Sequence, residues 1–222
     1  MPARESRDRM KSKDASKEKS EQEICGLLER SFGQNNIEKD PKINSNKADF
    51  LVKETDVYVE VFSIKDITSD LREETPHSKN VILINLKEKA EDKILDRIAS
   101  KILHECEQLP KGKPNVLVAK TEGIFVSPDD VIDALIGKPF LLIDKATMNT
   151  EKKHEPPLFR TEDELMNVLN RISVVIAYDN ICPHGKLCGV LGNNQNNAKI
   201  PLDEKIRSVF QAMLCEKCQS PA

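Results

Sequence analysis

The chain has 222 residues, a formal net charge of -3 and 32% charged residues. This length can bury a sizeable core without disulfide bonds, and the nearly balanced charge excludes a general attraction to phosphate backbones, so any nucleic-acid affinity must come from a local patch. No apolar run approaches the roughly 18 residues of a membrane span, and the N-terminus lacks the apolar segment of a secretory signal. These features predict a cytoplasmic protein with no membrane partner.

The N-terminal part of the chain changes character at Ser20. Residues 1–19 alternate basic and acidic side chains with few apolar ones, which predicts a disordered charged tail. Ser20 and Glu23 then have the spacing of a capping box, and Gly33 follows as a stop signal. The apolar residues between them fall on one helical stripe: Ile24, Leu27, Leu28 and Phe32. A short amphipathic helix is therefore predicted from Ser20 onward.

Strand and helix patterns alternate along the rest of the chain. Strands are predicted at 48–53, 57–64, 81–86, 115–120, 140–144 and 173–178. Helices are predicted at 90–109, 127–136, 161–172 and 201–214, and the polar run 192–199 is expected to be a solvated loop. This alternation predicts an α/β fold, a three-layer sandwich with a central mixed sheet. We expect a core over residues 20–145 and a C-terminal α/β extension over 146–222, packed on it.

The first two strands are expected to form a hairpin that pairs two acids. A two-residue turn at Glu54 and Thr55 would place Asp49 directly opposite Glu60. Like charges in that position are destabilising, and a divalent cation bound by carboxylate oxygens is one way to offset the repulsion. Two alternatives stay open: the acids could face solvent on an edge hairpin, or a turn shifted by one residue could place Phe62 opposite Asp49.

The order of these elements resembles the PD-(D/E)xK restriction-endonuclease-like superfamily. The resemblance covers about residues 20–121 and rests on a capped helix, Asp49 on one strand, Glu60-Val61-Phe62 on the next, a long helix and a buried strand. It implies a restriction-endonuclease-like core and a phosphodiesterase mechanism. Asp49, Glu60 and the carbonyl of Val61 would hold Mg²⁺ or Mn²⁺, which activates water and neutralises charge on the phosphate.

One part of the superfamily motif is missing, because Phe62 stands where the motif has a lysine. The resemblance implies that another element can supply the amine, often the following helix. Lys87 is the candidate, since it falls with Glu91 inside the apolar stripe of the long helix. The alternative is a solvent-reaching Lys87. The first helix of the superfamily can also donate an acid, for which Glu29 is available, although its helical position favours an exposed residue.

Four cysteines near the C-terminus form two pairs that could hold a structural Zn²⁺. They are Cys182, Cys188, Cys215 and Cys218. Four thiolates suit tetrahedral zinc, but the C-x5-C spacing of the first pair is irregular, and ordinary reduced thiols are the alternative.

Three functions follow from the sequence. The first is a metal-dependent DNA endonuclease that binds duplex DNA through its backbone, because 4% aromatic residues and no tryptophan argue against a stacking surface for single strands. The second is a catalytically inactive nuclease-fold scaffold. The third is an interaction protein with a zinc-stabilised C-terminal region. A homodimer is left open.

Overall fold

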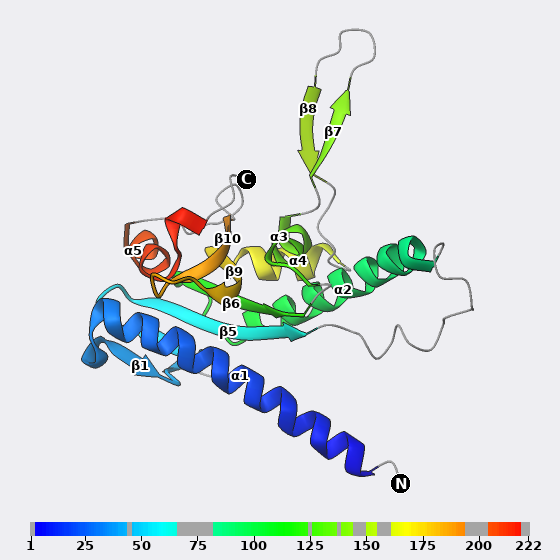
Figure 1. The fold of residues 1–222 in the computed structure, drawn as a ribbon. Coiled ribbons are helices and arrows are strands. Elements are labelled where there is room, and N and C mark those ends of the chain that lie inside the picture. Colours follow the sequence, from blue (N-terminus) through cyan, green and yellow to red (C-terminus); the bar gives the residue numbers. More distant parts are fainter. Residues whose placement is uncertain are drawn as a thin grey trace.

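The computed structural model of the protein describes residues 3–43, 46–65, 82–123, 126–136, 139–143, 150–154, 161–193 and 204–218. Within these residues the fold is α/β, with a six-stranded mixed sheet and five α-helices. Helices cover both faces of the sheet (Figure 1). The predicted α/β class with a mixed sheet is thus confirmed.

The sheet combines antiparallel edges with a parallel centre. Its strands, in spatial order, are β1 (Ile37–Lys39), β4 (Phe50–Val52), β5 (Val57–Lys65), β6 (Asn115–Glu122), β9 (Val174–Ile181) and β10 (Leu187–Asn193). The pairs β5–β6 and β6–β9 are parallel, and the other neighbours are antiparallel. The segment predicted as a C-terminal extension therefore supplies two strands of the same sheet.

Four further strands form two small ribbons outside this sheet. They are β2 (Lys42–Ile43) with β3 (Asn46–Lys47), and β7 (Pro139–Ile143) with β8 (Thr150–His154). The predicted strand at 140–144 corresponds to β7, but it pairs only within its own ribbon, which projects away from the sheet (Figure 1).

Five α-helices and two short 3-10 helices complete the described fold. They are α1 (Ala3–Phe32), α2 (Ile82–Cys106), α3 (Pro128–Ile136), α4 (Glu162–Leu169), α5 (Glu204–Met213), η1 (Gln34–Asn36) and η2 (Glu216–Cys218). The predicted cap of α4 is confirmed, since Thr161 Oγ1 accepts a hydrogen bond from the N–H of Glu164 over 3.1 Å. Pro201 and most of the predicted loop 192–199 lie outside the described residues.

The starts of α1 and α2 differ most from the sequence prediction. α1 begins at Ala3 and includes most of the predicted tail, so the predicted start at Ser20 is wrong. α2 begins at Ile82, and residues 82–86 are helical, so the strand predicted at 81–86 is wrong. A short apolar run is compatible with both structures, and here it continues the four-residue apolar spacing of the helix that follows.

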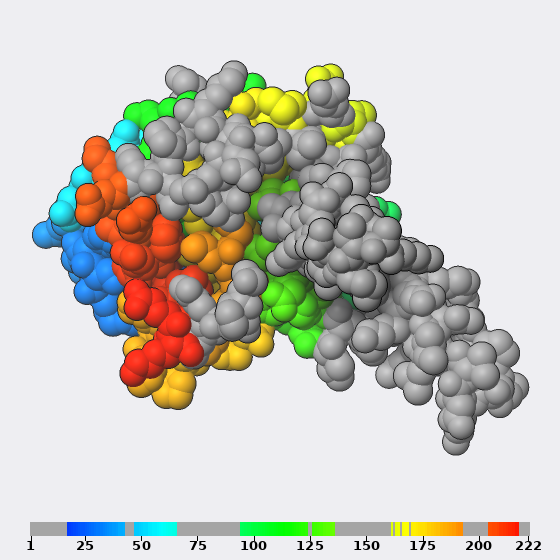
Figure 2. Space-filling view, turned by 90° about the horizontal axis from the view of Figure 1, so that it is seen from above, coloured from blue at the N-terminus to red at the C-terminus, as the bar shows by residue number. Residues whose placement is uncertain are grey.

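The two faces of the sheet carry separate hydrophobic cores. Alternation along β4 and β5 sends Phe50, Val52, Val57, Val59 and Val61 to the face covered by α1 and α5. The opposite face packs on α2, α3 and α4 and includes Tyr58, Phe62 and Ile64. This separation was predicted from the period-two pattern of the hairpin. Figure 2 shows α5 at the surface beside the N-terminal region.

The strand β5 extends beyond its partner β4. Their pairing covers only Phe50–Val52 and Val57–Val59, whereas β5 continues to Lys65. Side chains of α2 bind two of the carbonyls beyond this ladder: Lys101 Nζ donates to the carbonyl of Ser63 over 2.9 Å, and Arg97 donates to that of Lys65 over 2.6 Å. The short β4 thus leaves a gap beside Glu60 and Val61 that side chains from other elements reach.

A search of the described helices for membrane-spanning candidates finds none with the required length and apolarity.

Candidate functional site

Asp49 and Glu60 lie side by side at the end of the β4–β5 ladder. The register pairs Phe50 with Val59, and continuing it by one residue places Asp49 opposite Glu60, as the hairpin predicted. The alternative register, with Phe62 opposite Asp49, is wrong. Positive φ at Asp56 helps the chain to reverse between the two strands.

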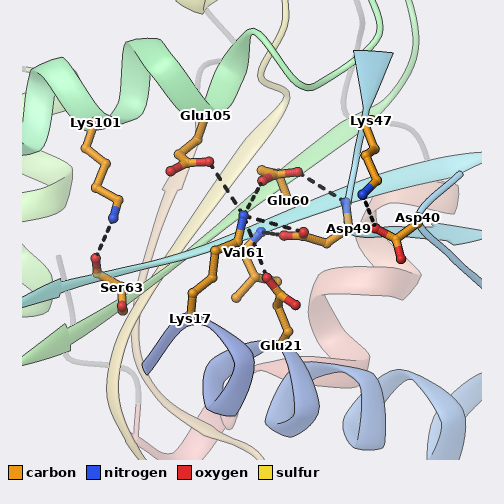
Figure 3. Close-up of polar contacts among 10 residues, drawn as sticks. All are labelled: Lys17, Glu21, Asp40, Lys47, Asp49, Glu60, Val61, Ser63, Lys101 and Glu105. Atoms are coloured by element: carbon orange, nitrogen blue, oxygen red, sulfur yellow. Dashed lines mark hydrogen bonds and ion pairs between the residues drawn. The ribbon is translucent and has the colours of Figure 1, made fainter. Parts of the chain in front are cut away.

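Two backbone groups fix the orientation of the acids. The N–H of Asp49 donates to Glu60 Oε2 over 3.1 Å, and the N–H of Val61 donates to Asp49 Oδ2 over 2.7 Å (Figure 3). Because the N–H and C=O of one residue in an extended strand point to the same side, the carbonyl of Val61 is directed toward this edge as well. The structure therefore brings together the three groups predicted as metal ligands.

A lysine that the sequence analysis did not select lies among these acids. Lys17 of α1 places its Nζ 3.3 Å from Glu60 Oε1 and 3.6 Å from Asp49 Oδ1. Two further carboxylates lie near the same nitrogen: Glu21 Oε1 at 3.6 Å, one turn along α1, and Glu105 Oε2 at 3.9 Å, from the end of α2. Figure 3 shows these four side chains converging on Lys17 from both faces of the sheet.

Burial makes negative charge on these clustered acids energetically costly. The side chain of Glu60 is 1% exposed and that of Glu105 is 9% exposed. Burial and the neighbouring Asp49 carboxylate raise the pKa of Glu60 far above its ordinary value, against the attraction of Lys17. Burial also raises the pKa of Asp49, although Lys17 and the N–H of Val61 oppose the shift. One ammonium therefore does not balance the acids, and the cluster would gain from more positive charge.

The neighbouring carboxylates keep the amine of Lys17 charged. Burial alone would lower the pKa of Lys17, but the carboxylates of Glu60 and Asp49 outweigh it and raise the pKa above its ordinary value. The side chain of Lys17 is 37% exposed, so solvent reaches the cluster on the α1 side. The cluster is thus a charged site with access from outside.

The oxygen donors of the cluster suit a hard divalent cation, which binds carboxylates and backbone carbonyls. Within the described ranges, no three or more His, Cys, Asp and Glu side chains already form a group able to hold a metal ion. The acids instead surround an ammonium at 3.3–3.9 Å, which is longer than the roughly 2.0–2.6 Å of metal–oxygen bonds. The chemistry of the donors fits Mg²⁺ or Mn²⁺, and the acids would have to move inward to bind it.

A second lysine stands beside the residue that replaces the motif lysine. Lys101 Nζ lies 5.7 Å from the centre of the Phe62 ring and donates to the carbonyl of Ser63. Lys101 and Glu105 are four residues apart, so α2 presents an amine and a carboxylate on one side. The missing amine is thus available next to Phe62.

Two residues proposed from the sequence lie elsewhere. The backbone of Lys87 is about 27 Å along the α2 axis from Glu105, at about 1.5 Å per residue, so the structure does not bring Lys87 to the acids. Glu29 forms an ion pair with Lys39 at 3.2 Å and accepts from the thiol of Cys25. The acid that α1 contributes is Glu21.

The position of Lys17 depends on how α1 is held against the sheet. Ile24, Leu27 and Leu28 pack into the core on that face. Glu23 accepts hydrogen bonds from Lys120 Nζ at 2.7 Å and from the Tyr178 hydroxyl at 3.2 Å. The capping-box role predicted for Glu23 is therefore wrong: this carboxylate joins the middle of a long helix to β6 and β9.

Arg171 holds the end of α2, and with it Glu105. Its Nη1 donates to the carbonyls of Cys106, Glu107 and Leu109 over 3.3, 3.0 and 2.9 Å. These carbonyls belong to the last turn of a helix and the turn after it, where backbone acceptors lack helical partners.

The predicted zinc cysteines belong to one corner of the fold. The N–H of Cys215 donates to the carbonyl of Leu187, and the N–H of Cys182 donates to the carbonyl of Lys186. Cys182 and Cys215 are buried and Cys188 is half-buried. The side chain of Cys218 lies outside the described part of the chain, so the zinc site stays a prediction.

Comparison with protein-family models, curated proteins and solved structures finds no match for this chain. The resemblance to the PD-(D/E)xK superfamily therefore rests on the residues and their arrangement alone.

The residues that sequence reasoning missed carried a recognisable signal. Lys17 and Glu21 precede Ile24 by seven and three residues, so they continue the apolar stripe of α1 with charged side chains. A charged residue at a core-facing position indicates a polar site under the helix. The signal was hidden because the stripe was read only from Ile24 onward.

Proposed function

We propose that this chain is a divalent-metal-dependent phosphodiesterase of PD-(D/E)xK type that acts on duplex DNA. One observation carries the proposal: Asp49, Glu60 and Glu105 all lie within 4 Å of a single cation position, and two of these three carboxylates are almost fully buried. Buried acids of like charge are costly unless a cation accompanies them.

The metal ligands would be Asp49, Glu60 and the carbonyl of Val61, with Glu105 as a further carboxylate. The cation would lower the pKa of a bound water and neutralise charge on the scissile phosphate. The hydrogen bonds from the N–H groups of Asp49 and Val61 keep the two acids oriented before a metal arrives. Such preorganisation reduces the cost of assembling the site.

Lys101 would supply the amine that Phe62 lacks. Its Nζ stands over the Phe62 ring and is held by the carbonyl of Ser63, on the same face of the sheet as the side chain of Glu60. An ammonium beside the acids can hold the attacking water and stabilise the negative charge that develops on the phosphate.

The catalytically inactive scaffold remains a second candidate, because one observation favours it. The Lys17 ammonium neutralises part of the negative charge of the acidic cluster. In such a relative Asp49 and Glu60 would serve only to hold α1 on the sheet.

Metal titration and DNA cleavage distinguish the two candidates. We expect Mn²⁺ binding and cleavage of plasmid DNA by the wild-type protein, and neither by Asp49→Asn. Asp96→Asn, which changes an exposed acid on α2, is the matched control. Binding of Mn²⁺ without cleavage would favour the scaffold, and absence of Mn²⁺ binding by the wild type would remove the nuclease proposal.

A further inference from the structure

The ammonium of Lys17 is shared among several acids. Its contacts to Glu60, Asp49, Glu21 and Glu105 span 3.3–3.9 Å. A single strong hydrogen bond between an ammonium and a carboxylate would be about 2.7–2.9 Å long. Lys17 therefore occupies the centre of the cluster, where one cation interacts with all four carboxylates at once.

That centre is also the place where a metal would contact these acids. Glu60 of β5 and Glu105 of α2 point toward it, and so does Asp49, which directly precedes β4 (Figure 3). Suppose that a divalent cation lies at bonding distance from their oxygens. In a poorly solvated site, this cation and the Lys17 ammonium would repel each other strongly. Both cannot hold this position together.

The part of α1 that carries Lys17 lies beyond the firm anchor of the helix. The anchored part begins at Ser20, which is fully buried, and includes Glu23, which binds Lys120 and Tyr178; Ser20 is three residues after Lys17, or about 4.5 Å along the axis. Figure 1 shows the N-terminal half of α1 extending past the sheet. Release of Lys17 would therefore remove a connection between this half of the helix and the body while leaving the anchor intact.

We propose that Lys17 is an internal counter-ion that a divalent cation displaces, so that metal binding releases α1 from the sheet at Lys17. This inference rests on the proposed metal site of Asp49 and Glu60. Its physical basis is competition: the same carboxylates serve the ammonium in the metal-free protein and the metal in the bound one. Metal binding and the contact of this part of α1 with the acids therefore weaken each other.

Calorimetric titration with Mn²⁺ alone tests the competition. Removing the ammonium in Lys17→Met should tighten Mn²⁺ binding by about tenfold or more, because the metal no longer displaces a charged group. Lys19→Met, which changes an exposed lysine on the same helix, should bind as the wild type does, and Asp49→Asn should not bind. Equal or weaker binding by Lys17→Met would overturn the counter-ion role while leaving the metal site in place.

A failure of the proposed function gives a different result from a failure of this inference. If neither the wild type nor Lys17→Met binds Mn²⁺, the metal site itself is absent. If only Lys17→Met binds Mn²⁺, Lys17 blocks the site without being displaced, and the displacement proposed here is overturned.

Hydrogen exchange of the wild-type chain provides a test that needs no variant. Adding saturating Mn²⁺ should speed exchange of backbone amides at positions 14–18 by about tenfold or more, with little change at positions 25–32, where α1 stays packed. Unchanged or slower exchange at 14–18 in the metal-bound protein would overturn the proposal.

Discussion

The backbone N–H of Asp49 donates to the carboxylate of Glu60 over 3.1 Å, so the residue that repels this carboxylate also holds it in place. Glu60 lies on β5 and Asp49 directly precedes β4, and Glu60 has almost no access to water. This relationship makes the protonation of Glu60 a property of the fold, with consequences for stability.

Glu60→Gln should stabilise the metal-free protein at alkaline pH. Burial and the Asp49 carboxylate raise the pKa of Glu60 in the folded state, so the unfolded chain releases this proton at a lower pH, about 4, than the folded chain does. Stability conferred by this proton is therefore present at low pH and is lost as the pH rises. Gln is permanently neutral and still offers an acceptor to the N–H of Asp49. We expect a gain of at least about 1 kcal/mol at pH 8.5 and a smaller one at pH 5.

Urea denaturation at both pH values, without divalent metal, measures this difference. Glu18→Gln, at an exposed position of α1, is the control and should leave the curve unchanged. Equal effects of Glu60→Gln at pH 5 and pH 8.5 would contradict the raised pKa of Glu60.

Lys101→Met should abolish cleavage and preserve metal binding. The amine of Lys101 stands beside Phe62 and donates to the carbonyl of Ser63, and Lys101 is not one of the proposed metal ligands. Loss of a group that stabilises developing charge typically reduces the rate about 100-fold or more. Plasmid cleavage and Mn²⁺ calorimetry of the same protein separate the two properties. Lys111→Met, at an exposed position after α2, is the control, and full activity of Lys101→Met would exclude this role.

Lys120→Met should destabilise the protein by about 1–3 kcal/mol, because it leaves the Glu23 carboxylate partly buried without its cation. The side chain of Lys120 is 10% exposed, and its contact to Glu23 is 2.7 Å long.

The chain offers a matched comparison for this loss. Lys113 and Asp56 form an ion pair of the same 2.7 Å length, but their side chains are 43% and 50% exposed. Removing such a pair typically costs about 0–1 kcal/mol. Chemical denaturation of Lys120→Met and Lys113→Met should therefore give clearly different midpoints. Similar midpoints would show that Lys120 does not anchor α1.

Arg171→Ala should lower the free energy of unfolding by about 2 kcal/mol, because three carbonyls at the end of α2 lose a charged donor. Arg171→Lys should retain part of this stability, since its single ammonium reaches fewer of these oxygens. Thermal and urea denaturation measure both variants, and Arg207→Ala, at an exposed position of α5, is the control. Unchanged stability of Arg171→Ala would contradict the capping role.

The hairpin that carries Asp49 and Glu60 was predictable because its information is local. Alternation of apolar residues predicted the two faces, and the assumed turn at Glu54 and Thr55 predicted the register that pairs Phe50 with Val59, although the turn itself spans residues 53–56. The prediction for the beginning of α2 was wrong for an equally local reason, because an apolar run at 82–86 fits either a strand or a buried helix.

The contribution of Lys17 depends on tertiary structure. Its amine reaches Glu60 only because α1 crosses the sheet where β4 has ended, and no local pattern reports the length of β4 relative to β5. The pairing of β6 with β9 was equally hidden, because more than fifty residues separate these neighbours in the chain.

That pairing has a consequence for synthesis on the ribosome. β6 is buried between β5 and β9, yet β9 ends only at Ile181, so an emerging chain exposes one edge of β6 until much of the last third has been translated. An unpaired apolar strand edge is prone to aggregate. Nascent chains that stop after residue 145 should therefore depend on chaperones, and a gene shortened there should yield inclusion bodies even though it still encodes Asp49, Glu60 and Glu105.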